Sequence, residues 1–205
     1  MRNISVISLS QRRRLIQSAR ILNRRALSTA AYVTEEVEVS PRRKAEGIEG
    51  RRPPIYVAAT RQHVGKTTTS LAVMSGLMKR FEKVGFMKPV GQKCLMVRDE
   101  FGKEVEVDKD VAVVRQHFHL NHCAYHNMSP VRILPGYTKN YIDGKLSNEE
   151  QLQTILDAYR AIDDCSDVVL CEGTGHCAVG SIVGASNARV AQWLGAKMVR
   201  LHCVV

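Results

Sequence analysis

Short apolar segments alternate with helical patterns along the chain from residue 55 onward. The apolar segments are rich in β-prone residues, and each is short enough to be a single strand. Because strands alternate with helices, the pattern predicts an α/β fold in which helices flank a mostly parallel sheet. The predicted strands lie at residues 55–59, 85–90, 167–172 and 197–205.

Helical periodicity fills the segments between these strands. A helix is predicted to begin after Gly65, and a capping box in residues 147–150 predicts the start of another. A further helix is expected from Asn187 to Leu194, before Gly195. The apolar residues expected on the buried faces are Leu71, Met74, Met78 and Phe81 in the first helix, and Leu152, Ile155, Leu156, Tyr159 and Ile162 in the second.

The positive charge of the chain is concentrated at its amino end. The 205 residues carry 30 Lys+Arg against 20 Asp+Glu, a formal net charge of +10. Residues 1–34 hold seven arginines and no acidic residue, so the rest of the chain, with 23 basic and 20 acidic groups, is nearly balanced. We therefore expect no nucleic-acid partner for the body of the protein. No apolar run approaches the roughly 20 residues of a membrane-spanning helix, so no membrane association is expected.

The first 54 residues are predicted to lie outside the folded domain. Residues 1–34 combine arginines with Ser, Leu, Ile and Ala, which predicts a mitochondrial transit peptide and a location in the matrix. A plastid address is the less favoured alternative, and a basic tail that binds RNA or anionic lipid is another. Residues 35–54 mix acids, bases and prolines with few apolar groups, which predicts a charged linker. The folded domain is expected at 55–205.

The segment after the first strand carries the strongest chemical signal. Gly65-Lys66-Thr67 lies between a predicted strand and a predicted helix, an arrangement that directs backbone N–H groups at a phosphate. Gly65 would allow the backbone to come close to the phosphate, Lys66 would neutralise the β- and γ-phosphates, and the Thr67 hydroxyl would complete the coordination shell of a Mg²⁺ ion. The standard motif has a glycine where this chain has Thr60. The residues predicted to bind the nucleotide are Thr60, Arg61, Gln62, His63, Val64, Gly65, Lys66, Thr67 and Thr68.

Two further groups stand at predicted strand ends. Glu172 ends a buried strand, where a carboxylate can reach Mg²⁺ beside a phosphate loop, although it could instead cap the loop that follows. Lys88 follows another strand, and ligands of open α/β sheets collect at the carboxyl ends of the strands. A lysine at a strand end is, taken alone, more often a solvated charge.

Taken together, four segments resemble the dethiobiotin synthetase family. They resemble more closely the related ATPase domain of cobyrinic acid a,c-diamide synthases and of the amino terminus of some bacterial phosphotransacetylases. The resemblance covers roughly residues 55–200. The segments are Ala59–Thr67, Lys88-Pro89-Val90, Asp108-Lys109-Asp110 and Glu172-Gly173-Thr174-Gly175.

The resemblance implies a P-loop NTPase fold, ATP and Mg²⁺ as cofactors, and frequent formation of homodimers. It implies that Lys66 and Lys88 are the catalytic residues, contacting the phosphates and stabilising charge during phosphoryl transfer. It also implies that Thr67, Asp110 and Glu172 surround the Mg²⁺. Relatives continue beyond the position of Val205, so we expect a form truncated at its carboxyl terminus, an alternatively spliced form or an incorrect gene model.

The expected function is ATP-dependent activation of a small carboxylate or carbamate by phosphoryl transfer, in a ligase-type reaction. The chain departs from the synthetase pattern at Ala59, at His63, and in residues 173–184. The resemblance therefore supports the phosphate-binding residues more strongly than it supports the substrate of the synthetase. The alternative is a regulatory module that binds nucleotide without chemistry, like the amino-terminal domain of phosphotransacetylases. An organellar RNA-binding protein is a third reading, which the basic amino end alone suggests.

Overall fold

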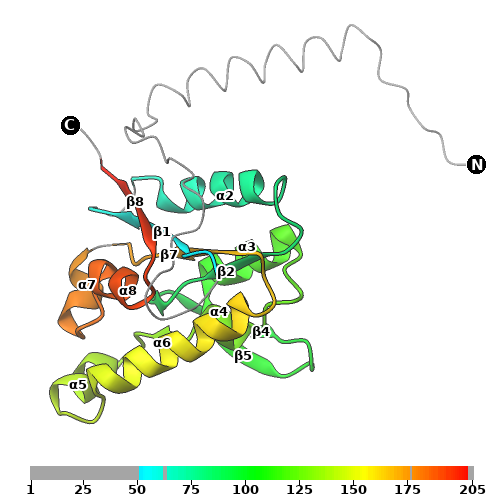
Figure 1. Cartoon of the computed structure of the whole chain (residues 1–205). Helices are drawn as coiled ribbons and strands as arrows, with labels where there is room; N and C mark the ends of the chain where they lie inside the picture. The colour runs from blue at the N-terminus through cyan, green and yellow to red at the C-terminus, as the bar shows by residue number, and fades with distance from the viewer. Residues whose placement is uncertain (1–50, 62–63, 176, 203–205) are drawn as a thin grey trace, which may run out of the picture. The chain divides into compact units, whose positions relative to one another are not determined.

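The computed structural model describes residues 51–61, 64–175 and 177–202 (Figure 1). The predicted transit peptide and most of the predicted linker lie outside the described residues. The described contacts begin with Arg51, whose guanidinium pairs with Asp163 at 3.0 Å, and with Arg52, which lies over the ring of Phe81. Pro54 follows, and its carbonyl accepts a hydrogen bond from the N–H of Lys197.

A parallel four-stranded sheet forms the centre of the domain, which confirms the predicted α/β fold. Its order is β2-β7-β1-β8, so β1, the first strand in the sequence, lies between β7 and β8, the last two. Every residue of β2 and β7 is buried, as expected for a parallel sheet covered on both faces. The strands are β1 (Ile55–Ala59), β2 (Val84–Met87), β7 (Val168–Glu172) and β8 (Lys197–Leu201).

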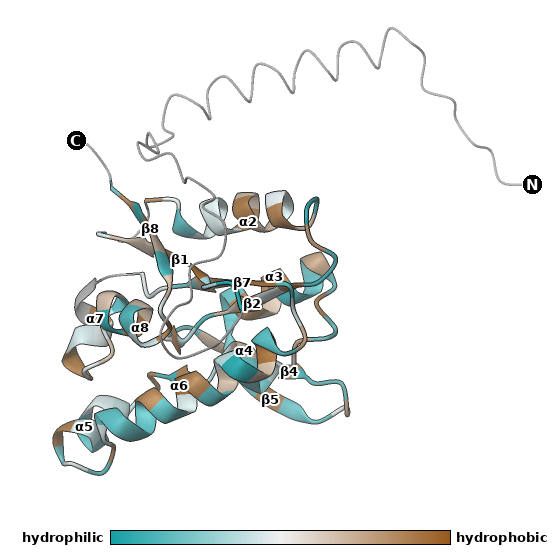
Figure 2. Ribbon diagram, viewed as in Figure 1, coloured by the Kyte–Doolittle hydropathy of each residue, from teal (hydrophilic) through white to brown (hydrophobic). Residues whose placement is uncertain are grey.

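Helices cover the sheet from both sides. In Figure 1, α2 (Lys66–Leu77) lies above the strands and α6 (Asn148–Asp163) below them. The predicted capping box is confirmed: the Ser147 hydroxyl accepts the N–H of Glu150, and the Glu150 carboxylate accepts the N–H of Ser147. Figure 2 shows β2 and β7 in brown, while the turns of α6 alternate between teal and brown, as an amphipathic helix does. The buried apolar residues of α6 include Ile155, Tyr159 and Ile162.

The predicted buried face of α2 is partly wrong. Met74 is fully buried, but Met78 is 37% exposed, and the other buried residues of the helix are Lys66 and Ser70. These three positions are four residues apart, so they form one row along the helix. Lys66, the first member of this row, contacts Glu172 at the end of β7, and Met78 lies one position past the end of the helix.

Residues 94–142 contain elements that the apolar pattern did not predict. A hairpin of β4 (Cys94–Arg98) and β5 (Glu104–Asp108) leads into α3 (Lys109–Phe118). The short helices α4 (Tyr125–Met128) and α5 (Tyr137–Ile142) follow. Between them, β6 (Val131–Arg132) pairs in parallel with β3 (Val90–Gly91). The remaining helices are α7 (Cys177–Ile182) and α8 (Asn187–Trp193).

The predicted strand at 85–90 is interrupted at Lys88 and Pro89. The N–H of Lys88 donates to the carbonyl of Met128 rather than to β7, and proline has no N–H to donate. The chain therefore leaves the central sheet after Met87 and pairs with β6 instead. This departure carries the Lys88 side chain to the carboxyl edge of the sheet.

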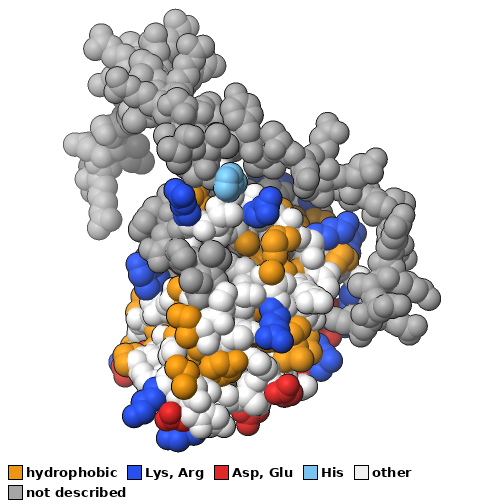
Figure 3. All heavy atoms as spheres, turned by 90° about the vertical axis from the view of Figure 1, so that its left-hand side faces the viewer, with side chains coloured by type: hydrophobic (Ala, Val, Ile, Leu, Met, Phe, Trp, Pro, Cys, Tyr) orange, Lys and Arg blue, Asp and Glu red, His pale blue; other side chains and the backbone are white. Residues whose placement is uncertain are grey.

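The described surface shows both signs of charge. On the face in Figure 3, basic side chains are dispersed among apolar and uncharged ones, and acidic side chains lie toward the bottom of the view. No helix in the described ranges is long and apolar enough to cross a membrane.

Candidate functional site

The candidate site lies where three neighbouring strands end. Because β7 pairs with both β1 and β2, the carboxyl ends of these strands stand side by side. The loop before α2 follows β1, Glu172 ends β7, and Lys88 follows β2. From β1 the sheet extends to β7 and β2 on one side and to β8 on the other. Open α/β sheets bind ligands at the point where the strand order reverses in this way.

Lys66 and Glu172 form a buried ion pair at the centre of this edge. Gly65 has a left-handed φ of 83°, which lets the chain turn directly into α2 with Lys66 as its first residue. The Lys66 ammonium lies 2.6 Å from Oε1 of Glu172, and the Thr67 hydroxyl donates to the same oxygen at 3.3 Å. The Glu172 side chain is 0% exposed, and its Oε2 has no hydrogen-bond partner among the described residues.

Lys88 forms a second buried ionic cluster. Its ammonium lies 2.9 Å from Oδ1 of Asp108 and also pairs with the carboxylate of Asp110. Burial alone would lower the pKa of Lys88, but the two carboxylates outweigh burial, and the pKa is raised. Burial would likewise raise the pKa of Asp110, but Lys88 outweighs it, and the pKa is lowered. Lys88 and Asp110 therefore each favour the charged form of the other.

Asp108 holds this cluster in place, and sequence reasoning assigned it no role. Its buried carboxylate accepts the N–H groups of Gln92 at 3.0 Å and Asp110 at 3.0 Å, in addition to the Lys88 ammonium. It is the N-cap of α3, and its Oδ2 also faces the N–H of Lys93. Gly91 leaves room for it, because a Cβ there would lie 2.8 Å from Oδ2. The available signal was an aspartate at the start of a helix, two residues before Asp110.

The structure brings some of the predicted nucleotide-binding residues together and leaves others apart. Lys66, Thr67 and Glu172 are in direct contact, and Lys66 is close enough to Asp110 to lower its pKa. The Thr60 N–H donates to the carbonyl of Leu201, and its hydroxyl bonds to Nδ1 of His202. Arg61 and Thr68 are exposed and Val64 is half-buried, while Gln62 and His63 lie outside the described residues.

The comparisons with known proteins agree with this geometry. The sequence model of the family described as "AAA domain" matches residues 54–201, which is more than half of the chain. The chain belongs to the AAA domain family. It is therefore a P-loop protein with a nucleotide-binding loop, and the predicted fold of that class is confirmed.

This AAA domain also resembles part of a larger enzyme. Over 126 residues, 58% of the chain, it is 31% identical to the phosphate acetyltransferase of Nitratidesulfovibrio vulgaris strain Hildenborough. The chain spans 15% of the length of that relative. The similarity therefore concerns one segment of the acetyltransferase.

The predicted Mg²⁺ ligands have suitable donor chemistry, but among the described residues no three His, Cys, Asp or Glu side chains are grouped as a metal site. The Thr67 hydroxyl and the carboxylates of Glu172 and Asp110 are hard oxygen donors, which Mg²⁺ prefers. Glu172 also presents a buried oxygen, Oε2, that no described residue satisfies. When bound, Mg²⁺ would supply positive charge to the phosphate oxygens.

Asn187 fixes the turn that follows Glu172. From the sequence it was predicted only as the first residue of a helix. Its Oδ1 accepts the N–H of Thr174 at 2.8 Å and the Thr174 hydroxyl at 3.1 Å. The same oxygen accepts the Tyr56 hydroxyl at 3.3 Å. Asn187 thus ties β1, the turn after β7 and the start of α8 together. Gly173 lies against this centre, since a Cβ there would approach Oδ1 of Asn187 to 2.6 Å.

We expect Gly173→Ala to destabilise the AAA domain by about 1–3 kcal/mol, because the added methyl would displace Asn187 or the Tyr56 ring. The matched control is Gly76→Ala in α2, where the new Cβ meets nothing within 4 Å. That change should stabilise by about 0.5–1 kcal/mol through helix propensity. Urea unfolding of both variants measures the difference, and equal midpoints would contradict the packing argument.

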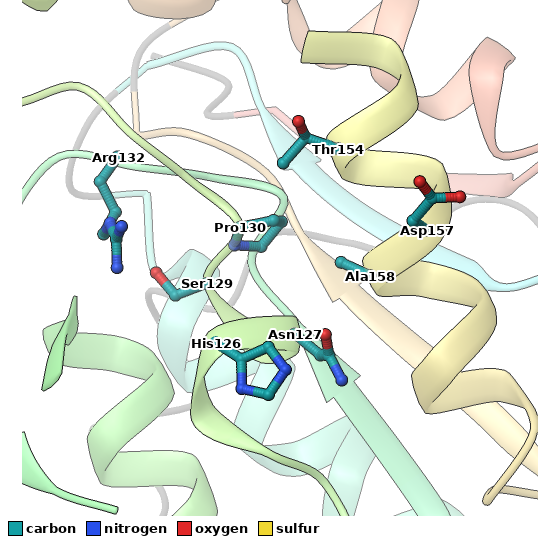
Figure 4. A pocket seen from close by; sticks show the side chains of 8 residues that line it. All are labelled: His126, Asn127, Ser129, Pro130, Arg132, Thr154, Asp157 and Ala158. Carbon is teal, nitrogen blue, oxygen red and sulfur yellow. The ribbon is translucent and has the colours of Figure 1, made fainter. Parts of the chain in front are cut away.

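A separate pocket lies beside this edge. Its volume is about 400 Å³, and it is formed by α4, the β6 segment and α6. Figure 4 shows Arg132 on one side and the α6 residues on the other, with Ser129 and Pro130 between them. The Ser129 hydroxyl accepts the N–H of Asp108, which connects the pocket wall to the Lys88 cluster. The lining residues are His126, Asn127, Ser129, Pro130, Arg132, Thr154, Asp157 and Ala158.

Proposed function

We propose that this AAA domain binds Mg·ATP and transfers its γ-phosphoryl group to a small carboxylate or carbamate, in a ligase-type reaction resembling that of dethiobiotin synthetase. One observation carries the proposal. Two buried lysines, Lys66 and Lys88, stand at the ends of neighbouring elements on the same sheet edge, and each is held by carboxylates. Two positive charges that both reached one phosphate would favour phosphoryl transfer over simple binding.

The residues would act by positioning and electrostatics. Phosphoryl transfer spreads negative charge over the oxygens of the transferred group, and fixed ammonium groups stabilise that charge. Lys66, at the start of α2, would turn from Glu172 toward the β- and γ-phosphates. Lys88 would approach the γ-phosphate from the neighbouring strand, and its raised pKa keeps it charged through the neutral pH range. The acceptor oxygen would attack phosphorus while the bond to ADP breaks.

We expect nucleotide binding to depend strongly on Mg²⁺. When Lys66 turns to the phosphates, Glu172 loses its cation, and an unpaired buried carboxylate is costly. A divalent cation removes that cost. In calorimetric titrations, ATP should bind at least about tenfold more weakly with EDTA than with Mg²⁺, a difference of about 1.4 kcal/mol.

Two variants test the origin of this dependence. Glu172→Gln removes the buried charge and should reduce the Mg²⁺ dependence. Glu104→Gln changes an exposed carboxylate of β5 and should leave the dependence intact. A parent protein that binds ATP equally with and without Mg²⁺ would contradict the assigned role of Glu172.

The second candidate is a regulatory module that binds nucleotide without turnover. The match to phosphate acetyltransferase favours it, because the aligned segment is only 15% of that protein. Such a module would bind Mg·ATP but release no ADP with any carboxylate acceptor. An assay of ADP release across a panel of carboxylates and carbamates, with and without the acceptor, separates the two candidates. Location in the mitochondrial matrix and homodimer formation remain part of the proposal.

A further inference from the structure

The pocket bounded by α4, β6 and α6 contains a guanidinium close to the Lys88 cluster. Arg132 lies in β6 and stands opposite Gly91 of β3 in the strand register. Gly91 in turn lies against Asp108, since a Cβ at Gly91 would approach the Asp108 carboxylate to 2.8 Å. Asp108 holds the Lys88 ammonium at 2.9 Å. Arg132 is therefore separated from the carboxylate that positions Lys88 by a single short strand.

The guanidinium of Arg132 is fixed but not neutralised. Its Nη1 donates to the main-chain carbonyl of Glu106 at 2.7 Å, which holds the half-buried side chain in place. In the described part of the chain, Arg132 forms no ion pair with a carboxylate. Asp157, across the pocket, pairs instead with Arg160 at 3.1 Å. The guanidinium thus keeps N–H donors and a full charge for a ligand.

The other walls of the pocket combine apolar surface with a few polar groups. His126 of α4 adds an imidazole ring, and Thr154 of α6 adds a hydroxyl that donates to the carbonyl of Glu150 (Figure 4). The volume of about 400 Å³ is that of a metabolite-sized site. Guanidinium groups in such sites bind carboxylate and phosphate through paired N–H donors.

We propose that this pocket binds a small molecule through an anionic group, a carboxylate or a phosphate, that Arg132 receives. This inference rests on the proposed function in one respect: the ligand would be the phosphoryl acceptor, bound through a second anionic group remote from the oxygen that reacts. Arg132 is then a residue that determines specificity, distinct from the lysines that contact the nucleotide. An acceptor with a single carboxylate would leave Arg132 without a partner.

The test measures anion binding with the phosphate loop filled. The parent protein is saturated with Mg·AMPPNP, and succinate or inorganic phosphate is then titrated while the NMR signals of the His126 ring and the Arg132 side chain are followed. Arg132→Gln should weaken binding at least tenfold. Arg98→Gln, an exposed arginine of β4, is the matched control and should change nothing. The preference for succinate or phosphate identifies the anionic group.

A second variant separates ligand binding from a structural role of Arg132. Thr154→Phe places a ring at the pocket from an exposed position of α6 and leaves the bond from Arg132 to Glu106 in place. It should block succinate and phosphate while the affinity for Mg·AMPPNP stays within twofold of the parent. Anion binding that is absent in the parent, or equal in all four proteins, would overturn the proposal. Failure to bind Mg·AMPPNP would instead overturn the proposed function, independently of the pocket.

Discussion

Replacing Lys66 with alanine is expected to lower the rate of ATP turnover by about a hundred- to a thousandfold. In the proposed reaction the change removes one of the two charges that would stabilise the transferred phosphoryl group, and losses of this size follow the removal of a single stabilising donor. It also leaves Glu172, which is 0% exposed, without its cation. The folded state should therefore lose about 3–5 kcal/mol. Release of ADP and chemical unfolding measure the two effects separately.

Two further variants make this expectation specific. Lys79→Ala removes an exposed lysine just beyond α2 and should change neither turnover nor stability. Adding Glu172→Gln to Lys66→Ala removes the unpaired buried charge, so stability should recover in part while turnover stays low. If Lys66→Ala retained most of the parent rate, the catalytic role of Lys66 would be wrong.

Asp108→Ala is expected to reduce both stability and turnover. The variant loses the N-cap of α3 and leaves the N–H groups of Gln92 and Asp110 without their acceptor. Loss of a cap and of these buried hydrogen bonds should cost about 2–4 kcal/mol. Turnover should fall further than unfolding explains, because the Lys88 ammonium would be held by Asp110 alone. Turnover measured at a denaturant concentration well below the unfolding midpoint reports on folded protein alone, and so isolates the effect on turnover from the loss of stability.

Asp108→Asn provides the graded comparison. Asparagine also caps helices well, so most of the stability should return, whereas the ion pair with Lys88 is lost. Glu104→Ala, on the same strand but exposed, is the control and should be close to the parent in both measurements. Full turnover in Asp108→Ala would show that Lys88 needs no support from Asp108.

The turn from the loop after β1 into α2, the central strands and the start of α6 could be predicted because local sequence determines them. Four-residue apolar runs form buried strands, Gly65 allows the left-handed turn, and Ser147 with Glu150 caps a helix through its own neighbours. The hairpin of β4 and β5 was missed, although Asp99 and Gly102 form its turn. The signal for β5 was available, because Glu104–Asp108 alternates acidic residues with valines. The apolar run of β4 gives no clear alternation, and most of that strand is exposed.

The missed site residues depend on contacts between distant parts of the chain. Asn187 bonds to Tyr56, which lies 131 positions away. The carboxylate of Asp108 is covered by Gly91 of β3 and by the N–H groups of the loop that follows it. Nothing in the neighbouring residues marks either side chain as buried. Local periodicity does not contain such information.

The paired lysines also affect how a nucleotide reaches the site. Two ammonium groups, Lys66 and Lys88, stand among three carboxylates, so the formal charge of the empty cluster is negative. The cluster alone therefore offers an incoming polyanion no net attraction, and long-range steering would have to come from charges elsewhere in the chain. A bound nucleotide must then displace carboxylates from the lysines, so exchange of ionic partners becomes a step of binding.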